Sequence, residues 1–264
     1  MKLIALGSNC IDYYVNIENG KPYPGGGPVN MAVYVVRLGG CASYLGPVGD
    51  DEYGRYMIKK IEASGVNISH IQITPGMTAL TEVKLIDNER IFGDYHEGVM
   101  NKYQISDEEI KYISTFDYAV CDVWGKPERY IEKISNIDIK IAFDCSTELD
   151  DQICNEVIPF CNYVFFSTEE SNILTVKEKM SNIHSLGPDL IVAMRGENGS
   201  ICYDGISFYE YGIVEVEEVI DTMGAGDSYI SGFLYGLSQN LCILDCMELG
   251  ARNASYTLTY FGAW

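Results

Sequence analysis

The chain has 264 residues, of which 47% are hydrophobic and 21% charged, and its formal net charge is −20. This composition is that of an ordinary globular protein and excludes disordered, collagen-like and coiled-coil chains. The surplus of acid argues against partners that need a basic face, namely nucleic acid and anionic membrane surfaces. No apolar run approaches the roughly 18–20 residues of a membrane span, and the apolar start at residues 3–6 is too short for a signal peptide.

Short β-like runs alternate with amphipathic helices along most of the chain. Strands are expected at residues 2–7, 42–48, 118–123, 139–143, 163–166 and 190–194. Helices are expected at 28–38 and 51–64, and another begins at Ser106, with Glu109 completing a capping box. Strands separated by helices need right-handed crossovers, which give a mostly parallel sheet covered by helices on both faces.

Two stretches depart from that alternation because their strands have no helix after them. The first is 11–17, which ends at Asn19-Gly20, and the second contains runs at 71–74, 81–86 and 90–95, with a hairpin-like turn at 87–89. We expect them to form a small sheet that projects as a lid over the strand ends, or else an edge extension of the main sheet. The sequence thus predicts one domain, 1–264, with a lid formed by about 11–24 and 70–98.

The strongest chemical signal is the segment Asp221-Thr222-Met223-Gly224-Ala225-Gly226-Asp227. It lies after a hairpin at 201–203 and 207–211 and a strand-like run at 213–220, and before a helix with an apolar face. A turn of small residues presents backbone N–H groups at the helix N-terminus, where an anion such as a phosphoryl group is favoured. Asp227 then stands where a general base should take a proton. The alternative is that Asp227 only caps the helix.

A second signal is the segment Gly25-Gly26-Gly27-Pro28-Val29-Asn30 before the first helix. Its glycines let the chain approach a ligand closely, and Asn30 would add a donor and an acceptor. It is not a dinucleotide fingerprint, and the chain contains no Walker motif, so any nucleotide must be held in another way. Asp12 follows the first strand; its carboxylate suits paired sugar hydroxyls, although a turn residue is the alternative.

The nine cysteines are odd in number and form no Cys-x-x-Cys pair. They predict reduced thiols in a cytoplasmic protein. The three histidines, His70, His96 and His184, lie in no His-Glu-x-x-His motif, which argues against a metallohydrolase.

In this order, the segments ending at Asp12, at Asn30 and at Asp227 resemble the ribokinase-like (PfkB) carbohydrate kinase family, over the whole chain. The resemblance implies an α/β fold: a three-layer α/β/α sandwich around a mostly parallel sheet, with a small β-sheet lid. It also implies transfer of the γ-phosphoryl group of ATP to a sugar hydroxyl, with Mg²⁺ and often a monovalent cation such as K⁺. Homodimers formed through the lid are frequent in the family.

The same resemblance assigns roles to individual residues. Asp227 would be the catalytic base, and the anion hole would be formed by Gly224, Ala225, Gly226 and Asp227. The sugar would be held by Asp12, Gly26, Gly27 and Asn30. The nucleotide would lie against Arg195, Gly196, Thr222 and Asn253, and a monovalent cation near Asp221 and the Met223 carbonyl.

Within the family, residues 87–100, Trp124-Gly125 and the terminal Gly262-Ala263-Trp264 are similar to fructoselysine 6-kinases. This implies that ATP and fructoselysine give fructoselysine 6-phosphate and ADP. The substrate is cationic overall, so the acidic Asp94, Glu97 or Asp12 would favour it over a neutral sugar, and Arg90 of the same lid strand is assigned to the substrate as well.

Two residues depart from the family pattern. Ser167 replaces the Asn of an Asn-x-x-Glu segment whose Glu, here Glu170, would order Mg²⁺ through water. Ser167 and Glu170 also predict a capping box for the next helix. Met194 stands where the family often has a hydroxyl residue.

The sequence therefore predicts a sugar kinase. A kinase of the same fold acting on fructose, ribose or a nucleoside is the nearest alternative, and a non-catalytic sugar-binding protein is the alternative from another class. A Rossmann dehydrogenase is disfavoured because no phosphate-binding fingerprint follows the first strand.

Overall fold

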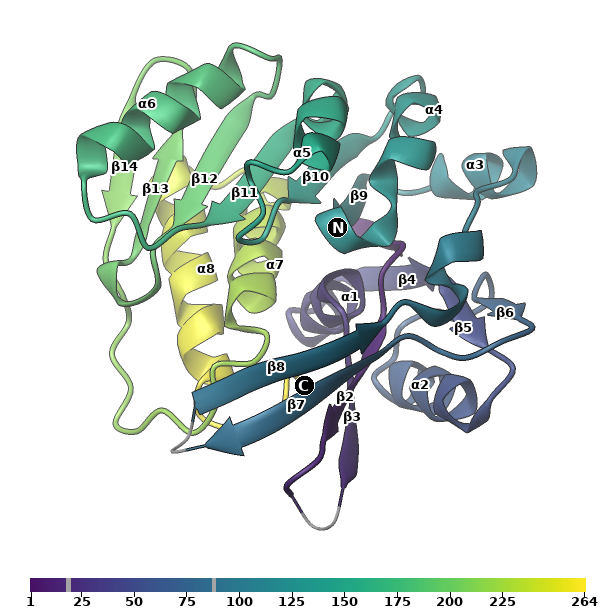
Figure 1. The fold of residues 1–264 in the computed structure, drawn as a ribbon. Helices are drawn as coiled ribbons and strands as arrows, with labels where there is room; N and C mark the ends of the chain where they lie inside the picture. The colour runs from purple at the N-terminus through teal and green to yellow at the C-terminus, as the bar shows by residue number, and fades with distance from the viewer. Residues whose placement is uncertain (18–19, 87–88) are drawn as a thin grey trace.

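The computed structural model describes residues 1–17, 20–86 and 89–264. Its centre is an eight-stranded sheet in the order β14-β13-β12-β11-β10-β9-β1-β4 (Figure 1). The strands are β1 (Lys2–Leu6), β4 (Cys41–Leu45), β9 (Tyr118–Asp122), β10 (Lys140–Asp144), β11 (Tyr163–Ser167), β12 (Leu190–Met194), β13 (Ser200–Tyr203) and β14 (Phe208–Tyr211). The pairs from β4 to β12 are parallel, and β13 and β14 add an antiparallel edge, so the expected mostly parallel sheet is confirmed.

Helices cover the sheet on both faces and produce two separate cores. One core includes residues of α1 (Gly27–Arg37), α2 (Glu52–Ala63), α7 (Ala225–Ser238) and α8 (Ile243–Thr257). The other includes residues of α3 (Asp107–Ile113), α4 (Ile131–Ser135), α5 (Gln152–Val157) and α6 (Ile173–His184). Successive strand residues serve opposite faces: Leu3 and Ala5 lie in the first core, and Ile4 and Leu6 in the second. The three-layer α/β/α fold is therefore confirmed.

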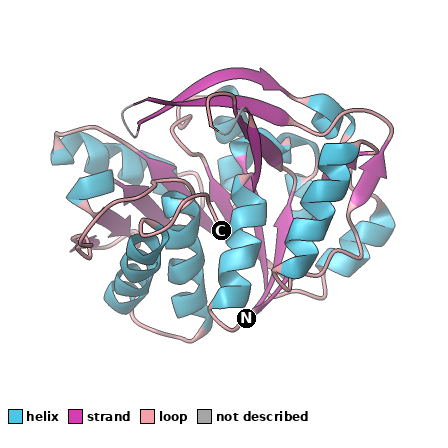
Figure 2. Cartoon of the chain, turned by 90° about the horizontal axis from the view of Figure 1, so that it is seen from below, coloured by secondary structure: helices cyan, strands magenta, loops and turns pink. Residues whose placement is uncertain are grey.

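A four-stranded sheet in the order β3-β2-β7-β8 forms the lid. Its strands are β2 (Cys10–Tyr14), β3 (Lys21–Gly25), β7 (Leu80–Ile86) and β8 (Glu89–His96). In both views the long β7–β8 hairpin extends across the molecule, outside the layers of the main sheet (Figure 1 and Figure 2). The two expected turns, at Asn19-Gly20 and at residues 87–89, include residues that lie outside the described ones.

The run at 71–74 does not belong to the lid, contrary to expectation. It forms β6 (Gln72–Thr74), which pairs in parallel with β5 (Pro47–Gly49) in a separate two-stranded sheet. Gln72 is fixed there because its side chain donates to the Gln104 carbonyl and to Glu109. The expected strand 42–48 is likewise divided into β4 and β5 at Gly46, which lies so close to the Tyr44 hydroxyl and the Gly7 carbonyl that no Cβ would fit.

Two further expectations about local structure are wrong. The run 213–220 is irregular rather than a strand, and it leaves the edge of β14 to line a cavity. Ser167 and Glu170 form no capping box, because Ser167 ends β11 and the N-cap of α6 is Asn172, whose side chain accepts from the Leu174 N–H. By contrast, the Ser106–Glu109 capping box of α3 is confirmed.

Short 3₁₀ turns complete the chain: η1 (Gly98–Lys102), η2 (Val123–Gly125), η3 (Pro127–Arg129), η4 (Ile158–Phe160) and η5 (Gly196–Asn198). None of the helices in the described part of the chain combines the length and the apolar character needed to cross a bilayer.

Candidate active site

The carboxyl ends of the central parallel strands bring four side chains to one edge of the sheet. Asp122 ends β9 and Asp144 ends β10, and these two residues are partners in the strand register. Ser167 and Met194 end β11 and β12 and are partners in the same way. In open α/β sheets, ligands bind outside the carboxyl ends of the strands, so this edge is the candidate site.

Asp227 lies in the first turn of α7 but does not cap it. The N-cap is Gly224, in the left-handed region with φ 73°, and no side chain caps this helix. The Asp227 carboxylate instead accepts a hydrogen bond from the Asn30 side chain, with 2.7 Å between Nδ2 and Oδ2. Because no side chain occupies the helix start, its first N–H groups are left for an anion.

Asn30, the expected sugar ligand, has both ends of its side chain engaged within the protein. Besides donating to Asp227, it accepts from the indole of Trp264, with 2.7 Å between Nε1 and Oδ1. Asn30 is only 3% exposed. The structure therefore gives it a role in orienting Asp227, through a chain of contacts that begins at the C-terminal residue.

Two glycines at the start of α1, Gly26 and Gly27, allow close packing near Asp122 and Asp227. A Cβ on Gly27 would lie 3.2 Å from an oxygen of Asp227 and 3.0 Å from one of Asp122, and a Cβ on Gly26 would lie 2.5 Å from the Asn9 backbone. Gly26 also has φ 104°, which other residues rarely adopt. Glycine at position 27 keeps the space between the two carboxylates open, and glycine at position 26 lets the chain pass close to the Asn9 backbone.

The buried acids share a raised affinity for protons. Burial raises the pKa of Asp227 to about 6, although the hydrogen bond from Asn30 opposes the shift. Burial also raises the pKa of Asp122 to about 7 and that of Asp144 to about 8, and the nearby charge of Asp227 adds to both shifts. An acid with a pKa near neutrality is suited to exchange protons at physiological pH.

The lid supplies two charged residues to this region. Asp12, on β2, is 7% exposed, and burial raises its pKa to about 7 while the positive charge of Arg90 opposes the shift. Arg90, on β8, forms an ion pair with Asp221 at the base of the turn before α7. The structure thus brings Asp12, Arg90 and Asp221 together below the lid.

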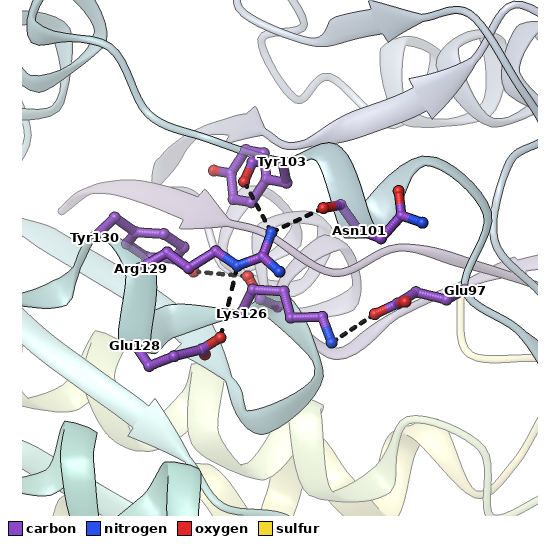
Figure 3. Close-up of polar contacts among 8 residues, drawn as sticks. Glu97, Asn101, Tyr103, Lys126, Glu128, Arg129 and Tyr130 are labelled. Atoms are coloured by element: carbon purple, nitrogen blue, oxygen red, sulfur yellow. Dashed lines mark hydrogen bonds and ion pairs between the residues drawn. The ribbon is translucent and has the colours of Figure 1, made fainter.

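The other two lid acids lie elsewhere. Asp94 is exposed on β8. Glu97 forms an ion pair with Lys126, 2.5 Å from Nζ to Oε1 (Figure 3). Nearby, Arg129 donates to the Asn101 carbonyl at 2.9 Å, so these contacts attach η1, which follows the lid, to the loop after β9. Glu97 is therefore engaged in holding the base of the lid.

A cavity of about 630 Å³ opens beside the start of α7. Of the expected nucleotide and anion-hole residues, it is lined by Gly196, Thr222, Ala225 and Gly226, together with Ser167 and Met194. Arg195 and Asn253 are not among its lining residues. The Asn253 side chain donates to the Ser228 carbonyl at 2.6 Å and so joins α8 to α7, while Ala251, Ala254, Ser255 and Leu258 of α8 line the cavity.

The expected metal-binding residue Glu170 is exposed, and one of its carboxylate oxygens accepts the Asn172 N–H at 2.7 Å. Within residues 1–17, 20–86 and 89–264, no three His, Cys, Asp or Glu side chains are grouped as a metal site would require.

The sequence analysis did not single out Asp122 and Asp144, which lie near Asp227 at the edge of the main sheet. Asp122 accepts from the Ser8 hydroxyl at 2.6 Å, and the backbone N–H groups of Trp124 and Gly125 also lower its pKa, while Oδ1 of Asn9 is buried without a hydrogen-bond partner in the structure. Buried polar atoms without partners are uncommon and call for an explanation such as a missing ligand. Asp122 and Asp144 could have been found, because each stands at the end of an expected parallel strand.

Comparisons with known proteins show the family and the fold of the chain. The model of the pfkB family of carbohydrate kinases matches residues 2–264. The chain is 37% identical to the fructoselysine 6-kinase of Escherichia coli (strain K12), covering all of both chains. It is 31% identical to the fructosamine kinase FrlD of Bacillus subtilis (strain 168), covering 100% of this chain and 93% of that one. Its fold is similar to Arabidopsis thaliana ribokinase complexed with ribose and ATP, with a TM-score of 0.90, 17% identity, and coverage of 99% of this chain and 93% of that one.

Proposed function

This chain belongs to the pfkB family of carbohydrate kinases, and we propose that its substrate is fructoselysine, which it phosphorylates on O6 with ATP. Similarity to fructoselysine 6-kinase over the full length supports this substrate. The observation that carries the proposal is the uncapped start of α7, with Asp227 held by Asn30 beside a cavity that reaches the same turn.

In the proposed mechanism, Asp227 accepts the proton of the O6 hydroxyl while the oxygen attacks phosphorus. The new O–P bond forms as the bond from phosphorus to the leaving oxygen of ADP breaks. The N–H groups of Ala225, Gly226 and Asp227 face the charge on the phosphoryl oxygens. A positioned base contributes roughly 10²–10⁴-fold to the rate, and the loss of one anion-hole donor costs roughly 10²–10³-fold.

The cavity fits a nucleotide, whose terminal phosphoryl group is the one transferred. Its volume lies within the range of about 300–1,000 Å³ typical of small-ligand sites. Small residues form much of its wall, and a Cβ on Gly196 or Gly212 would meet no atom within 4 Å, so the wall is open there. We assign the adenine ring of ATP to the side of the cavity lined by α8 and residues 213–219, and the phosphates to the side lined by Gly226.

Kinases of this family use a divalent metal with ATP, and we propose Mg²⁺ here. Mg²⁺ prefers oxygen ligands and is commonly shared between phosphates, water and one or two carboxylates. Glu170 fits that pattern because it is exposed and only one of its oxygens is shown accepting a hydrogen bond. When bound, the metal would neutralise phosphate charge.

The K⁺ site implied near Asp221 and the Met223 carbonyl does not fit the residues present. The Asp221 carboxylate accepts two backbone N–H groups and is paired with Arg90. We therefore assign K⁺ no role in the reaction.

For the sugar, we propose that Asp12 and Asp122 bind hydroxyl groups, Asp122 in the space that Gly27 keeps open. Both acids are buried, and a Cβ on Gly27 would lie 3.0 Å from an oxygen of Asp122. Of the two other lid acids, we propose that the exposed Asp94 attracts the ammonium group of the lysine part, since Glu97 is already paired with Lys126.

We further propose that two copies of the chain associate through the lid, and that the protein is cytoplasmic. The lid exposes large apolar side chains, namely Ile86, Ile91, Phe92 and Tyr95, and exposed apolar patches commonly mark interfaces. Dimerisation is tested by measuring the molar mass of the wild-type protein and of Ile91→Glu in solution. The wild type should have the mass of two chains and Ile91→Glu the mass of one. The cytoplasmic assignment rests on nine free cysteines, which suit a reducing compartment.

The substrate proposal is tested by coupled ADP release with fructoselysine, fructose, ribose and adenosine, with and without Mg²⁺. We expect fructoselysine to have the highest kcat/KM and the rate to need Mg²⁺. A higher kcat/KM for another sugar or for adenosine would replace fructoselysine as the substrate. No release with any of the four would leave the non-catalytic sugar-binding protein as the better interpretation.

A further inference from the structure

One buried ion pair connects the lid to the turn that begins α7. Arg90 pairs with Leu85 near the turn of the β7–β8 hairpin, far along the chain from Asp221, and the side chains of Arg90 and Asp221 are 10% and 4% exposed. Surface ion pairs contribute little, whereas a pair removed from water strongly penalises the loss of either partner. The position of the lid and the position of the turn are therefore linked.

Asp221 holds the turn together with both carboxylate oxygens. Oδ1 accepts the Met223 N–H at 3.0 Å, and Oδ2 accepts the Gly262 N–H at 2.8 Å. Gly224, which follows Met223, has no room for a side chain, because a Cβ there would lie 2.7 Å from the Tyr34 hydroxyl and 3.1 Å from Ala263. A shift of Asp221 would thus move the segment whose N–H groups face the phosphate.

The surroundings of Arg90 are acidic and favour a cation. Burial lowers the pKa of Arg90, and the neighbouring Tyr14 and Asp12 offset this only in part, yet a guanidinium stays protonated in proteins. Arg90 also opposes the rise in the pKa of Asp12, to which the charge of Asp227 contributes. The guanidinium therefore lies between the negative charges of Asp12 and Asp221.

We propose that the guanidinium of Arg90 takes the place of a monovalent metal ion at Asp221. Because Arg90 belongs to the lid, the turn between Asp221 and α7 is stabilised in this way only when the lid lies over it. A metal ion beside the guanidinium would be repelled by its like charge. A side chain on the lid differs from a free ion because it leaves when the lid opens. Arg90 is thus a positioning residue that acts through Asp221, and this inference rests on the proposed kinase function.

The test compares the wild-type protein with Arg90→Gln in K⁺ and in tetramethylammonium at equal ionic strength. In the ADP-release assay with fructoselysine, the wild-type kcat should agree in the two salts to within about twofold. Arg90→Gln should lose roughly 10²-fold in kcat in tetramethylammonium, and K⁺ should restore at least about tenfold of it. A free cation can then occupy the place of the guanidinium.

A second readout needs no sugar. K⁺ should raise the Tm of Arg90→Gln but not that of the wild type, because binding to the folded state stabilises it. Lys84→Gln is the matched control, since it removes a positive charge from an exposed position on the same hairpin. Lys84→Gln should leave both kcat and the K⁺ response unchanged.

Several-fold activation of the wild type by K⁺, or a K⁺-dependent rise in its Tm, would overturn the inference. So would an Arg90→Gln variant whose rate and Tm ignore K⁺. If Arg90→Gln does not fold, Arg90→Lys should keep part of the activity and remain insensitive to K⁺; activation of Arg90→Lys by K⁺ counts against the inference. Failure of the wild type to phosphorylate fructoselysine would contradict the proposed substrate, while the Tm comparison would still decide the role of Arg90.

Discussion

Helices α3 and α7 each carry an acidic residue in their first turn, and its side chain has a different partner in each helix. Each has an acid at its third position, Glu109 in α3 and Asp227 in α7. Glu109 reaches back to accept the Ser106 N–H at 2.7 Å, and the Ser106 hydroxyl accepts the Glu109 N–H at 3.3 Å. Asp227 instead accepts from Asn30 of another helix, and its N-cap is a glycine. The start of α7 thus differs from that of α3 because its cap has no side chain and a residue of another helix orients its acid.

The largest effect is expected from Asp227→Asn, which removes the base and keeps the shape. We expect kcat to fall by about 10³-fold or more, with fructoselysine affinity within a few-fold and Tm not reduced. Steady-state kinetics and calorimetric binding check this. The matched control is Glu109→Gln at the same position of α3, which should leave kcat unchanged. Turnover of Asp227→Asn within tenfold of the wild type would show that Asp227 is not the base.

The next effect comes from filling the helix start. At Gly226 a Cβ would meet only Met194, at 3.7 Å, so Gly226→Val folds but places methyl groups where the phosphate approaches the N–H groups. We expect kcat/KM for ATP to fall by roughly 10²-fold, and Gly226→Ala to lose less. The same kinetics with ATP varied check it. An unchanged kcat/KM for ATP in the valine variant would place the phosphate elsewhere.

A smaller effect concerns the pH at which Asp227 loses its charge. A base must be ionised, so kcat should fall as pH drops below about 6. The Asn30 hydrogen bond stabilises the charged form, so Asn30→Ala should raise the pKa and move this acid limb to higher pH. The pH profile of kcat checks the direction. Because Asp122 and Asp144 titrate nearby, the limb reports the group of acids as a whole. A limb that stays in place or moves to lower pH would contradict the role of Asn30.

The smallest effect on activity is expected where the helix start is capped. Ser106→Ala removes the cap of α3 and should lower the free energy of unfolding by about 1 kcal/mol, with kcat unchanged. Thermal unfolding and the ADP-release assay check the two parts. A loss of kcat in this variant would mean that the two helix starts do not differ in function as proposed.

Much of the fold follows from local pattern. The run Leu190–Met194 is β12 without any change of bounds, and the capping box at Ser106 predicts the start of α3 correctly. The errors have a common cause. Residues 213–220 have strand-like composition but are irregular, and residues 71–74 contain a strand that pairs with β5 instead of the lid. A strand's partner depends on where the chain returns, which composition does not show.

Some features of the candidate site also follow from local sequence, and others depend on the fold. The turn at 224–227 could be found in the sequence because it consists of small residues beside one another before a helix. The contacts of Asn30 with Trp264, of Arg90 with Asp221 and of Asp122 with Ser8 could not, since each joins residues more than 100 positions apart.

The sequence by itself indicated the alternation of strands and helices, the small-residue turn before α7 and the resemblance to the family, because these depend on periodicity and on neighbouring residues. Only the tertiary structure decided that Asn30 donates to Asp227, that Glu97 pairs with Lys126 and that Arg90 of the lid pairs with Asp221. Burial and charge act through space, and the folded chain alone sets which groups are removed from water together.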